Sequence, residues 1–451
     1  MVGLKDRHRY TMVLPAPMFN SPPPAGRAGR AQGLGAGRAQ GLAAGLAQGL
    51  AAGLAPGWHR GWHRGWRRDP ARPAGRAGGG LVCETHRGKW QQQGAKMRAA
   101  VTRGGKLVVG EVADVQPGSG HVVARSLAAG ICGSDLHALA DFAHFTGLMD
   151  SVGVPALDHE HDCVFGHEFC AEIVEHGPDT AKTLPVGARV CSVPIILGAS
   201  GIEQIGYSNL YPGALAEHIA LQEMLLLPVP DSLDTNLAAL TEPLAVGEHA
   251  VGLSGLEPGQ PCLVVGCGPV GLAVIAALKG RGHGPVLAAD FSPTRRRLAE
   301  AFGADEVIDP AESSPHDRWA SFGVPTGIME RAGATMMGSD IKDPVIFEAV
   351  GVPGMLQSLI ADAPPHSRIV VVGVCMHSDT IEPFMAVTKE IELRFSFGYH
   401  PNEFALTLER LGAGVPGADL LVTSTVGLAG APIAFDMLRT PGEHGKILVT
   451  P

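Results

Sequence analysis

The chain has 451 residues, of which 45% are hydrophobic and 18% are charged, and its formal net charge is −9. This length allows two or more domains with full hydrophobic cores. The charge is unevenly distributed: residues 1–96 carry 15 basic and 3 acidic side chains (net +12), and the remainder carries 20 and 41 (net −21). The acidic remainder argues against a nucleic-acid-binding body, since a phosphate backbone needs a basic face. No apolar run reaches the roughly 18 residues that would predict a membrane span.

Residues 1–96 differ in character from the rest of the chain. Positions 24–80 are nearly all Gly, Ala, Leu, Arg, Gln or Pro, with short repeats such as GRAQGL and GWHR. Each glycine in a helix interior costs about 1 kcal/mol relative to alanine, so we expect a disordered, low-complexity extension. An organellar transit peptide and a basic, Trp-bearing tail that touches nucleic acid or anionic lipid are alternatives. We favour a translation start assigned too early, because ordinary globular composition begins at Met97.

The eight cysteines form no CxxC pair and have no regular spacing. In a chain of this length, such cysteines are typical of a reduced, cytoplasmic protein with individual thiols. No continuous apolar core follows the basic start, so a secretory signal is not expected.

A glycine-rich segment carries the first motif with chemical meaning. The apolar run at 262–265 predicts a buried strand, and Gly266-x-Gly268-x-x-Gly271 then opens a helix rich in Ala, Leu and Val. A second apolar strand, at 286–289, follows that helix and leads into Asp290, 19 residues after the last of these glycines. Strand, glycines, helix and acid in this order predict a dinucleotide-binding fold with the pyrophosphate on the helix N-terminus. A glycine turn that serves only packing is the alternative.

The acid at the end of the second strand indicates which dinucleotide is bound. Asp290 would accept hydrogen bonds from the adenosine ribose and repel a 2′-phosphate, which favours NAD over NADP. The run Arg295–Arg297 leaves NADP open, because an arginine can hold a 2′-phosphate. The predicted cofactor-binding residues are Gly266, Gly268, Pro269, Val270, Gly271, Asp290 and Arg295.

Later segments extend this fold. The apolar stretches 345–348 and 369–373 are strand candidates with helical stretches between them. Strands that alternate with helices predict a parallel, doubly wound sheet.

Potential metal ligands lie upstream of and just before the glycine motif. They are one thiol, one imidazole and two carboxyl groups, at Cys132, His167, Glu168 and Glu242. Zinc accepts S, N and O ligands, and a catalytic zinc keeps one position open. Cys132 and His167 are suited to be permanent ligands, and Glu168 or Glu242 could complete the set. Each residue also has an ordinary structural explanation, so spacing alone makes a metal site only one of the options.

Here the sequence resembles the zinc-containing medium-chain dehydrogenase/reductase family, the alcohol and polyol dehydrogenases. The resemblance covers Met97 to Pro451, and the motifs follow the family's order. They are the MRAA opening at 97–100, GICGSDLH at 130–137, GHE at 166–168, GARV at 187–190, EPLAV at 242–246, the glycine motif, and the GKILV closing segment at 445–449. The GHE and EPLAV segments are more similar to the sorbitol, threonine and sugar dehydrogenase branches.

The resemblance implies an α/β protein with two domains after the extension. A partly open β-barrel (GroES-like) catalytic domain would span residues 97–236, and a doubly wound Rossmann domain would span 237–398. The chain would then return to the catalytic domain over 399–451. It also implies a homo-dimer or homo-tetramer.

The resemblance further implies the chemistry. Zinc would act as a Lewis acid on an alcohol or polyol oxygen while NAD takes the hydride. The implied catalytic residues are Cys132, Ser134, His137, His167 and Glu168. Of these, Ser134 and His137 match the family's proton relay to solvent. Asp135 would orient the ring of His167, although an aspartate that caps a helix would look the same.

Two departures from the family pattern matter. The segment 193–211 contains no cysteine, so we expect no structural zinc. The spacing from Cys132 to His167 is longer than usual, and 142–165 is expected to be a solvated polar loop. Two alternatives are that its histidines and Cys163 line the substrate mouth, or that His159–Cys163 forms a second metal site. Two other functions stay open: a zinc-free, quinone-reductase-like enzyme and a non-catalytic dinucleotide-binding protein.

Overall fold

The computed structural model describes residues 95–154, 157–198, 201–440 and 444–451. The expectations for the extension therefore lie outside the described residues, apart from its last two positions. Among the described residues, β1 begins at Lys96, which pairs with Ala113 of the next strand.

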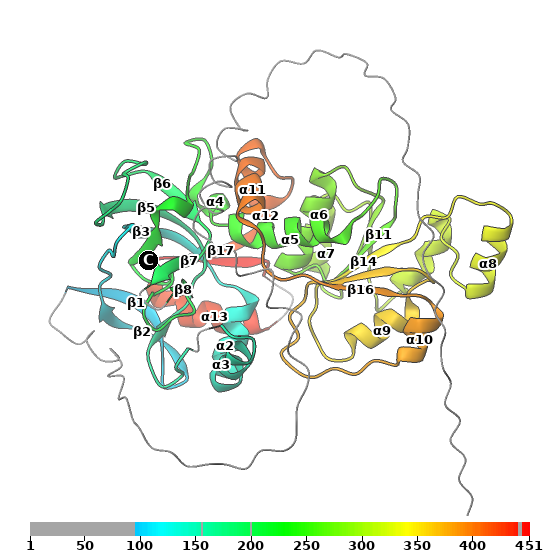
Figure 1. Cartoon of the computed structure of the whole chain (residues 1–451), viewed down its shortest axis with the longest axis horizontal. Coiled ribbons are helices and arrows are strands. Elements are labelled where there is room, and N and C mark those ends of the chain that lie inside the picture. Colours follow the sequence, from blue (N-terminus) through cyan, green and yellow to red (C-terminus); the bar gives the residue numbers. More distant parts are fainter. Residues whose placement is uncertain (1–94, 155–156, 199–200, 441–443) are drawn as a thin grey trace, which may run out of the picture. The chain divides into compact units, whose positions relative to one another are not determined.

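The first part of the body is built from two mainly antiparallel sheets (Figure 1). The smaller has the order β2-β1-β4, with β1 Lys96–Arg103, β2 Lys106–Ala113 and β4 Cys163–Val164. The larger has the order β10-β6-β5-β3-β18-β17, with β9 also on β3. Its strands are β3 His121–Gly130, β5 Glu168–His176, β6 Arg189–Ser192, β9 His218–Gln222, β10 Leu226–Pro228, β17 Val422–Gly427 and β18 Lys446–Thr450.

The end of the chain returns to this first part, as predicted. Strand β18 pairs antiparallel with β3 and parallel with β17. Both β17 and β18 belong to the C-terminal segment that returns to this part. The described fold thus confirms the expected class, a GroES-like domain interrupted by a dinucleotide-binding fold.

The inserted part is a six-stranded, wholly parallel sheet of order β13-β12-β11-β14-β15-β16. Its strands are β11 Cys262–Val265, β12 Val286–Ala289, β13 Glu306–Ile308, β14 Val345–Glu348, β15 Arg368–Val371 and β16 Glu392–Phe395. The order reverses between β11 and β14, and ligands of such sheets bind outside the carboxyl ends of the strands at that reversal.

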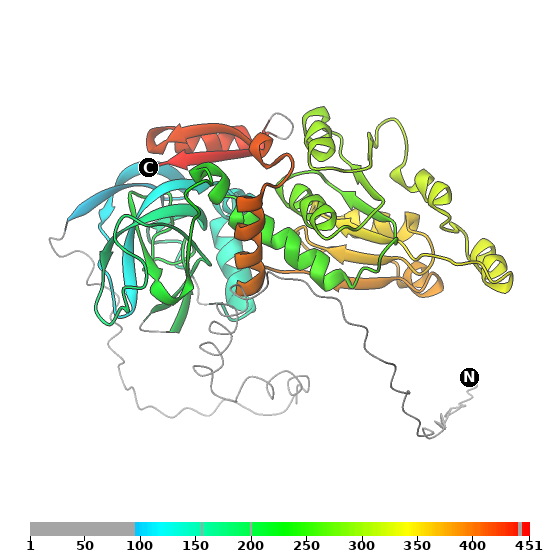
Figure 2. The same ribbon diagram turned by 90° about the horizontal axis from the view of Figure 1, so that it is seen from above.

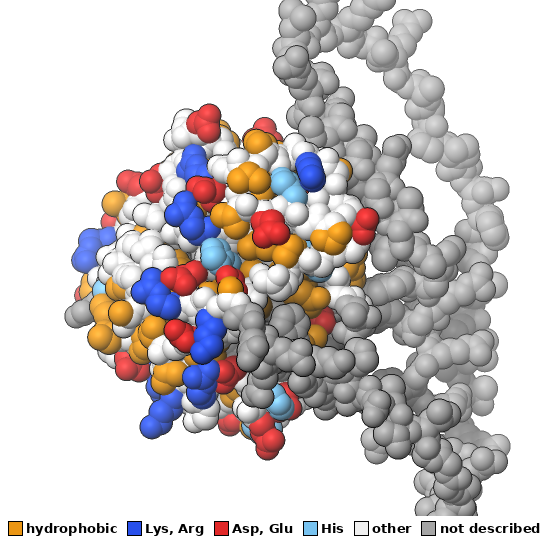
Figure 3. Space-filling view, turned by 90° about the vertical axis from the view of Figure 1, so that its left-hand side faces the viewer, with side chains coloured by type: hydrophobic (Ala, Val, Ile, Leu, Met, Phe, Trp, Pro, Cys, Tyr) orange, Lys and Arg blue, Asp and Glu red, His pale blue; other side chains and the backbone are white. Residues whose placement is uncertain are grey.

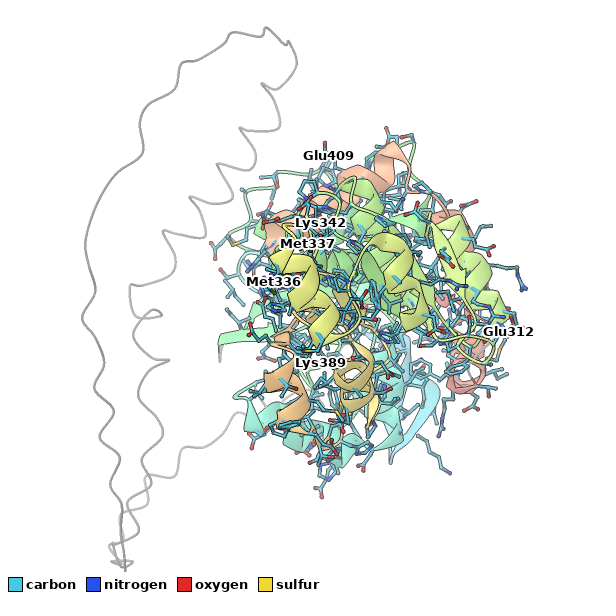
Figure 4. All side chains as sticks on the ribbon, turned by 90° about the vertical axis from the view of Figure 1, so that its right-hand side faces the viewer. Glu312, Met336, Met337, Lys342, Lys389 and Glu409 are labelled. Carbon is cyan, nitrogen blue, oxygen red and sulfur yellow. The ribbon has the colours of Figure 1, made fainter. Side chains whose placement is uncertain are left out.

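Helices cover both faces of this sheet (Figures 1 and 2). Alternate side chains of each strand point to opposite faces, so Val264 joins the core under α6 whereas Leu263 joins the core under α9. The helices are α6 Pro269–Gly280, α7 Pro293–Ala301, α8 Ile328–Met336, α9 Met355–Asp362 and α10 Pro383–Thr388. Helix α8 buries none of its residues, and Met336 and Met337 at its end are 88% and 85% exposed (Figure 4).

Helix α5 Thr241–Ser254 joins the two parts. It packs on α6 so closely that a Cβ on Gly247 would lie 2.2 Å from the backbone carbonyl carbon of Ala273. It also packs on α11 Pro401–Ala413. One continuous core holds Ala128 of β3 together with Val264 of β11, so the start of α5 lies beside the larger antiparallel sheet.

The segment 142–165, expected to be a polar loop, is partly helical. Helix α3 Phe142–Ser151 follows α2 Gly133–Ala140, and Phe145 is buried because the helix lays its apolar side on the core. The cysteine-free segment forms the hairpin β7 Ile195–Gly198 and β8 Gly201–Gln204. The remaining helices are α4 Thr235–Ala238, α12 Ala418–Leu421 and α13 Ala431–Arg439, with 3-10 turns at Glu223–Leu225, Pro315–Phe322 and Leu428–Gly430.

Two further features of the described residues bear on possible partners: the length and hydropathy of the helices, and the distribution of charge on the face in view. None of the helices in the described ranges is long and apolar enough to cross a membrane. On the face drawn in Figure 3, basic and acidic side chains are interspersed rather than gathered by sign.

Candidate active site

Pairing of β3 with β5 brings the two metal-ligand motifs together. Gly130 lies opposite Glu168 in the register, so Cys132 comes beside His167. The approach is so close that a Cβ on Gly130 would lie 2.0 Å from Glu168 Oε2, which only glycine permits. One ligand atom each of Cys132, His167 and Glu168 lie within 4.8 Å of one another.

The imidazole of His167 lies in a negatively charged, water-poor surrounding. It is 5% exposed, and its Nδ1 lies 3.5 Å from Asp135 Oδ1. Burial lowers the pKa of His167, but the charges of Asp135 and Cys132 outweigh burial and raise that pKa well above its ordinary value. A pocket that favours a positive charge this strongly suits a bound cation.

Asp135 performs both of the roles that the sequence left open. It is fully buried, and its Oδ2 accepts a hydrogen bond of 3.0 Å from the backbone N–H of Cys132, which begins α2. Its Oδ1 faces the ring of His167. The same carboxylate therefore caps the helix and orients the imidazole.

Tyr207 completes this arrangement, and sequence reasoning missed it. Its hydroxyl oxygen lies 2.8 Å from Asp135 Oδ1 and 2.8 Å from Ser134 Oγ, and its ring lies 5.2 Å from that of His167. Burial, followed by the charge of Asp135, raises the pKa of Tyr207 well above its ordinary value, so the phenol keeps its proton. A carboxylate only accepts, so Tyr207 donates to Asp135 and Ser134 donates to Tyr207. His137, the other predicted relay residue, is exposed on α2.

A buried lysine neutralises Glu168. Lys446 Nζ, from the closing strand β18, lies 2.7 and 2.8 Å from the two carboxylate oxygens and 3.1 Å from the carbonyl oxygen of Ile131. The side chains of Lys446 and Glu168 are 2% and 1% exposed. Burial lowers the pKa of Lys446, but the charge of Glu168, followed by that of Cys132, outweighs burial and raises it. Lys446 is thus the counter-charge of the cluster.

Glu242 faces the cluster from the first turn of α5 but does not belong to the group of ligand atoms within 4.8 Å. Burial raises the pKa of its carboxyl to about 7, His167 opposes this rise, and Glu168 adds to it. Tyr399, just before α11, hydrogen-bonds to Glu242. Glu242 is therefore close enough to be influenced by the ligands and poised between its two protonation states.

The donor set fits zinc. A thiol, an imidazole and a carboxylate converge on one buried point, and zinc takes these three ligand types. The buried Nδ1 of His167 has no hydrogen-bond partner in the described structure. That nitrogen lies 3.5 Å from Asp135 Oδ1, so Asp135 is the carboxylate placed to orient the ring of a metal-bound histidine.

The glycine motif forms the predicted turn between β11 and α6. Gly266 has a φ of +89°, and a Cβ on Gly271 would lie 1.8 Å from the carbonyl oxygen of Gly266. Gly268 begins α6, and Pro269 occupies its first turn. The turn therefore exposes backbone N–H groups at a helix N-terminus, where a pyrophosphate binds.

Asp290 lies at the end of β12, beside this turn. Its oxygens accept hydrogen bonds from the backbone N–H groups of Cys267 (2.8 Å) and Ser292 (2.7 Å). Arg295 Nη1 lies 3.8 Å from Asp290 Oδ2, and its buried Nε has no partner in the described structure. An unpaired guanidinium donor beside the turn fits an acceptor from the adenosine half of a dinucleotide.

The structure does not assemble the alternative metal site at His159–Cys163. Among the described residues, the groups that could hold a metal are the cluster above and a second one at His249, His400 and Glu403. Instead, Cys163 is buried in β4, and Asp162 pairs with Arg103. Asp162 is therefore engaged in a structural ion pair.

Comparisons with known proteins agree with this geometry. The family profile described as "Alcohol dehydrogenase GroES-like domain" matches residues 118–231, and "Zinc-binding dehydrogenase" matches residues 269–413. The chain is similar to (R,R)-butanediol dehydrogenase of Bacillus subtilis (strain 168), with 34% identity over 71% of this chain and 90% of that protein. It is also similar to sorbitol dehydrogenase of the same strain, with 29% identity over 79% and 97%.

A solved structure shows the same fold. The crystal structure of 2R,3R-butanediol dehydrogenase from Bacillus subtilis superposes with a TM-score of 0.62. It is 28% identical and covers 79% of this chain and 99% of its own.

Proposed function

Because the chain belongs to the zinc-binding medium-chain dehydrogenases, we propose that it transfers a hydride between an alcohol or polyol, or the matching carbonyl compound, and NAD. The observation that carries the proposal is the convergence of Cys132, His167 and Glu168 on one buried point. Relatives named as butanediol and sorbitol dehydrogenases support a small diol or polyol as the substrate class.

Three residues would hold the metal: Cys132, His167 and Glu168. When bound, zinc supplies a Lewis acid for the substrate oxygen, and the nicotinamide supplies the hydride acceptor. Asp135 and Tyr207 hold the imidazole in place, and Lys446 offsets the negative charge of Glu168. Glu242, whose carboxyl has a pKa raised to about 7, can accept or release a proton at the rim of the cluster.

We assign the proton path to Ser134 and His137. The hydroxyl of Ser134 is hydrogen-bonded to Tyr207 inside the site, whereas His137 is exposed one helical turn further along α2. Ser134 can pass a proton by rotating its hydroxyl, and an exposed imidazole can exchange that proton with water near neutral pH.

Asp290 and Arg295 would select and hold the dinucleotide. The Asp290 carboxylate is fixed by two backbone N–H groups at the place where the adenosine ribose is expected. Its negative charge disfavours a 2′-phosphate, which supports NAD over NADP.

We propose a second copy of this chain as the macromolecular partner. Strand β16 is an edge of the parallel sheet, and Phe395 and Phe397 at its end are 68% and 82% exposed. An unpaired edge with exposed aromatic side chains suits pairing with an identical edge. Light scattering tests this: a molar mass of one chain, both for the unaltered protein and for Phe397→Lys, would contradict the proposal.

The free cysteines of the described residues support a reducing, cytoplasmic location.

The proposed function is tested on the purified full chain by counting zinc and following NADH formation. The substrate panel starts with (R,R)-2,3-butanediol and sorbitol, each with and without a chelator. Chelator-sensitive NADH formation supports the proposal. Activity that survives complete loss of metal would indicate the zinc-free alternative, and NAD binding without turnover or metal would indicate a non-catalytic protein.

A further inference from the structure

A second group of metal-binding side chains lies where α5 meets α11, apart from the candidate active site. His249 comes from α5, and His400 and Glu403 come from the start of α11. One ligand atom of each lies within 4.8 Å of the other two. No motif of the proposed function includes these residues.

The packing of the two helices fixes the arrangement. Glu403, in the first turn of α11, accepts a hydrogen bond of 2.7 Å from the backbone N–H of His400, which begins that helix. The same oxygen, Oε2, lies 2.9 Å from Nδ1 of His249. The side chains of His249 and Glu403 are only 16% and 14% exposed, so their geometry is held by the helix contact.

A hydrogen bond between His249 and Glu403 would by itself explain a structural link between the two helices. Such a link does not require the third side chain, His400. The ring of His400 stands nearly perpendicular to that of His249, with centroids 5.1 Å apart, and His400 is exposed. The group is therefore open to solvent on one side, which gives a cation an entry path.

The nearby positive charge is already paired. Arg281 lies next to Gly252, as does Glu403 Oε1. Its Nε donates a hydrogen bond of 2.8 Å to Glu248 Oε1, and Arg410 pairs with the other oxygen of Glu248. Both arginines thus pair with Glu248, whereas Glu403 Oε2 contacts His249 and the backbone N–H of His400.

We propose that His249, His400 and Glu403 form a second divalent-metal site of the zinc or nickel type, with a position left for water. Two imidazoles and one carboxylate are a ligand set that such ions take. The cation replaces the proton shared by His249 Nδ1 and Glu403 Oε2, and His249 then carries its proton on Nε2.

This second site would act on the active site through the same two elements. His249 lies seven residues after Glu242 on α5, so the two side chains are on similar sides of the helix, about two turns apart. His400 directly follows Tyr399, which hydrogen-bonds to Glu242. A metal held here fastens α5 to α11 and so limits how far Glu242 and Tyr399 can separate.

The test counts zinc in the full chain after equilibration with excess Zn²⁺ and removal of loose metal. We expect His400→Ala to hold one zinc fewer per chain than the unaltered protein, with His159→Ala, another exposed histidine, as the matched control. Cu²⁺ added to zinc-loaded protein provides a second readout, since its electron paramagnetic resonance spectrum reports imidazole nitrogen. Removing one of three ligands should weaken this binding by on the order of tenfold or more.

Each outcome decides the proposal. Equal zinc content in His400→Ala, His159→Ala and the unaltered chain would overturn it, as would copper spectra that His400→Ala leaves unchanged. Cys132→Ser separates this proposal from the proposed function: it should remove the active-site zinc and leave the copper signal intact. A raised melting temperature with added zinc that His400→Ala abolishes would support the fastening of α5 to α11.

Discussion

The two candidate sites of this protein would hold their ligands by different physical means. The dinucleotide turn presents backbone N–H groups at the start of α6, and its specific contacts depend on glycines that allow close approach. The candidate metal centre instead gathers buried charges: Cys132, Glu168 and Asp135 against His167 and Lys446. A site made of compensating buried charges should lose far more from one side-chain change than a site made of backbone groups.

The largest effect is expected at the metal centre. Cys132→Ser removes the thiolate ligand, so turnover should fall by on the order of a thousandfold or more, since a Lewis acid contributes several kcal/mol to the transition state. NAD binding should persist, because the glycine turn is built independently. Zinc content, steady-state rates and NADH fluorescence measure the three quantities. Retained turnover in a zinc-free variant would refute the assignment.

The buried ion pair should dominate stability. Lys446→Met leaves the Glu168 carboxylate without its partner, and such a change costs about 3–5 kcal/mol. Urea denaturation measures the free energy of unfolding. Adding Glu168→Gln to this variant should recover most of the loss. Lys96→Met, which breaks the exposed pair with Glu111, is the matched control and should change stability little. An equal loss of unfolding free energy in Lys446→Met and Lys96→Met would contradict the view that the buried pair contributes more to stability than the exposed one.

A smaller effect is expected when the charge beneath His167 is removed. In Asp135→Asn, the side-chain oxygen can still accept from Cys132 and the amide can donate to Tyr207, so the fold should survive. Loss of the carboxylate should weaken zinc binding about 10- to 100-fold. Competition with a chelator measures this affinity. An unchanged zinc affinity would show that Asp135 only caps α2.

The smallest effect is expected at the cofactor turn. Asp290→Asn can keep one backbone hydrogen bond but loses the charge that repels a 2′-phosphate. We expect the ratio of kcat/KM for NADP to that for NAD to rise about tenfold, which corresponds to about 1.4 kcal/mol. Rates with both cofactors at equal substrate give this ratio. A ratio that stays the same would place the selection elsewhere, for example at Arg295.

Most of the fold was predictable because its motifs are local. The strands 262–265, 286–289 and 345–348 were predicted at the observed bounds, since continuous apolar runs between glycine-rich turns have few other solutions. The segment 142–165 was not, because its helix α3 is short and its apolar residues are interrupted by polar ones. Its burial against the core is what stabilises it.

The metal centre could be predicted only in part. Motif resemblance indicated Cys132, His167 and Glu168, but nothing in the sequence pointed to Tyr207 or to a role for Lys446. Each lies at least 39 residues from the nearest of these three ligands and reaches the site only through the tertiary fold, Lys446 by the pairing of β18 with β3 and Tyr207 from the bend after β8. Lys446 could have been predicted to contact Glu168 only if the pairing of β18 with β3 had been known, because that pairing places the two residues next to each other.

The sequence by itself indicated the parallel sheet and the dinucleotide turn, because glycine conformation and apolar periodicity act over short stretches of chain. Motif resemblance, rather than any such pattern, indicated Cys132 and His167 as ligands. The tertiary structure alone decided that the carboxyl of Glu168 lies in the cluster with Cys132 and His167, that Lys446 pairs with it, and that His249, His400 and Glu403 meet. These outcomes depend on distances between segments far apart in the chain, and those distances are set by strand register and helix packing rather than by any local pattern.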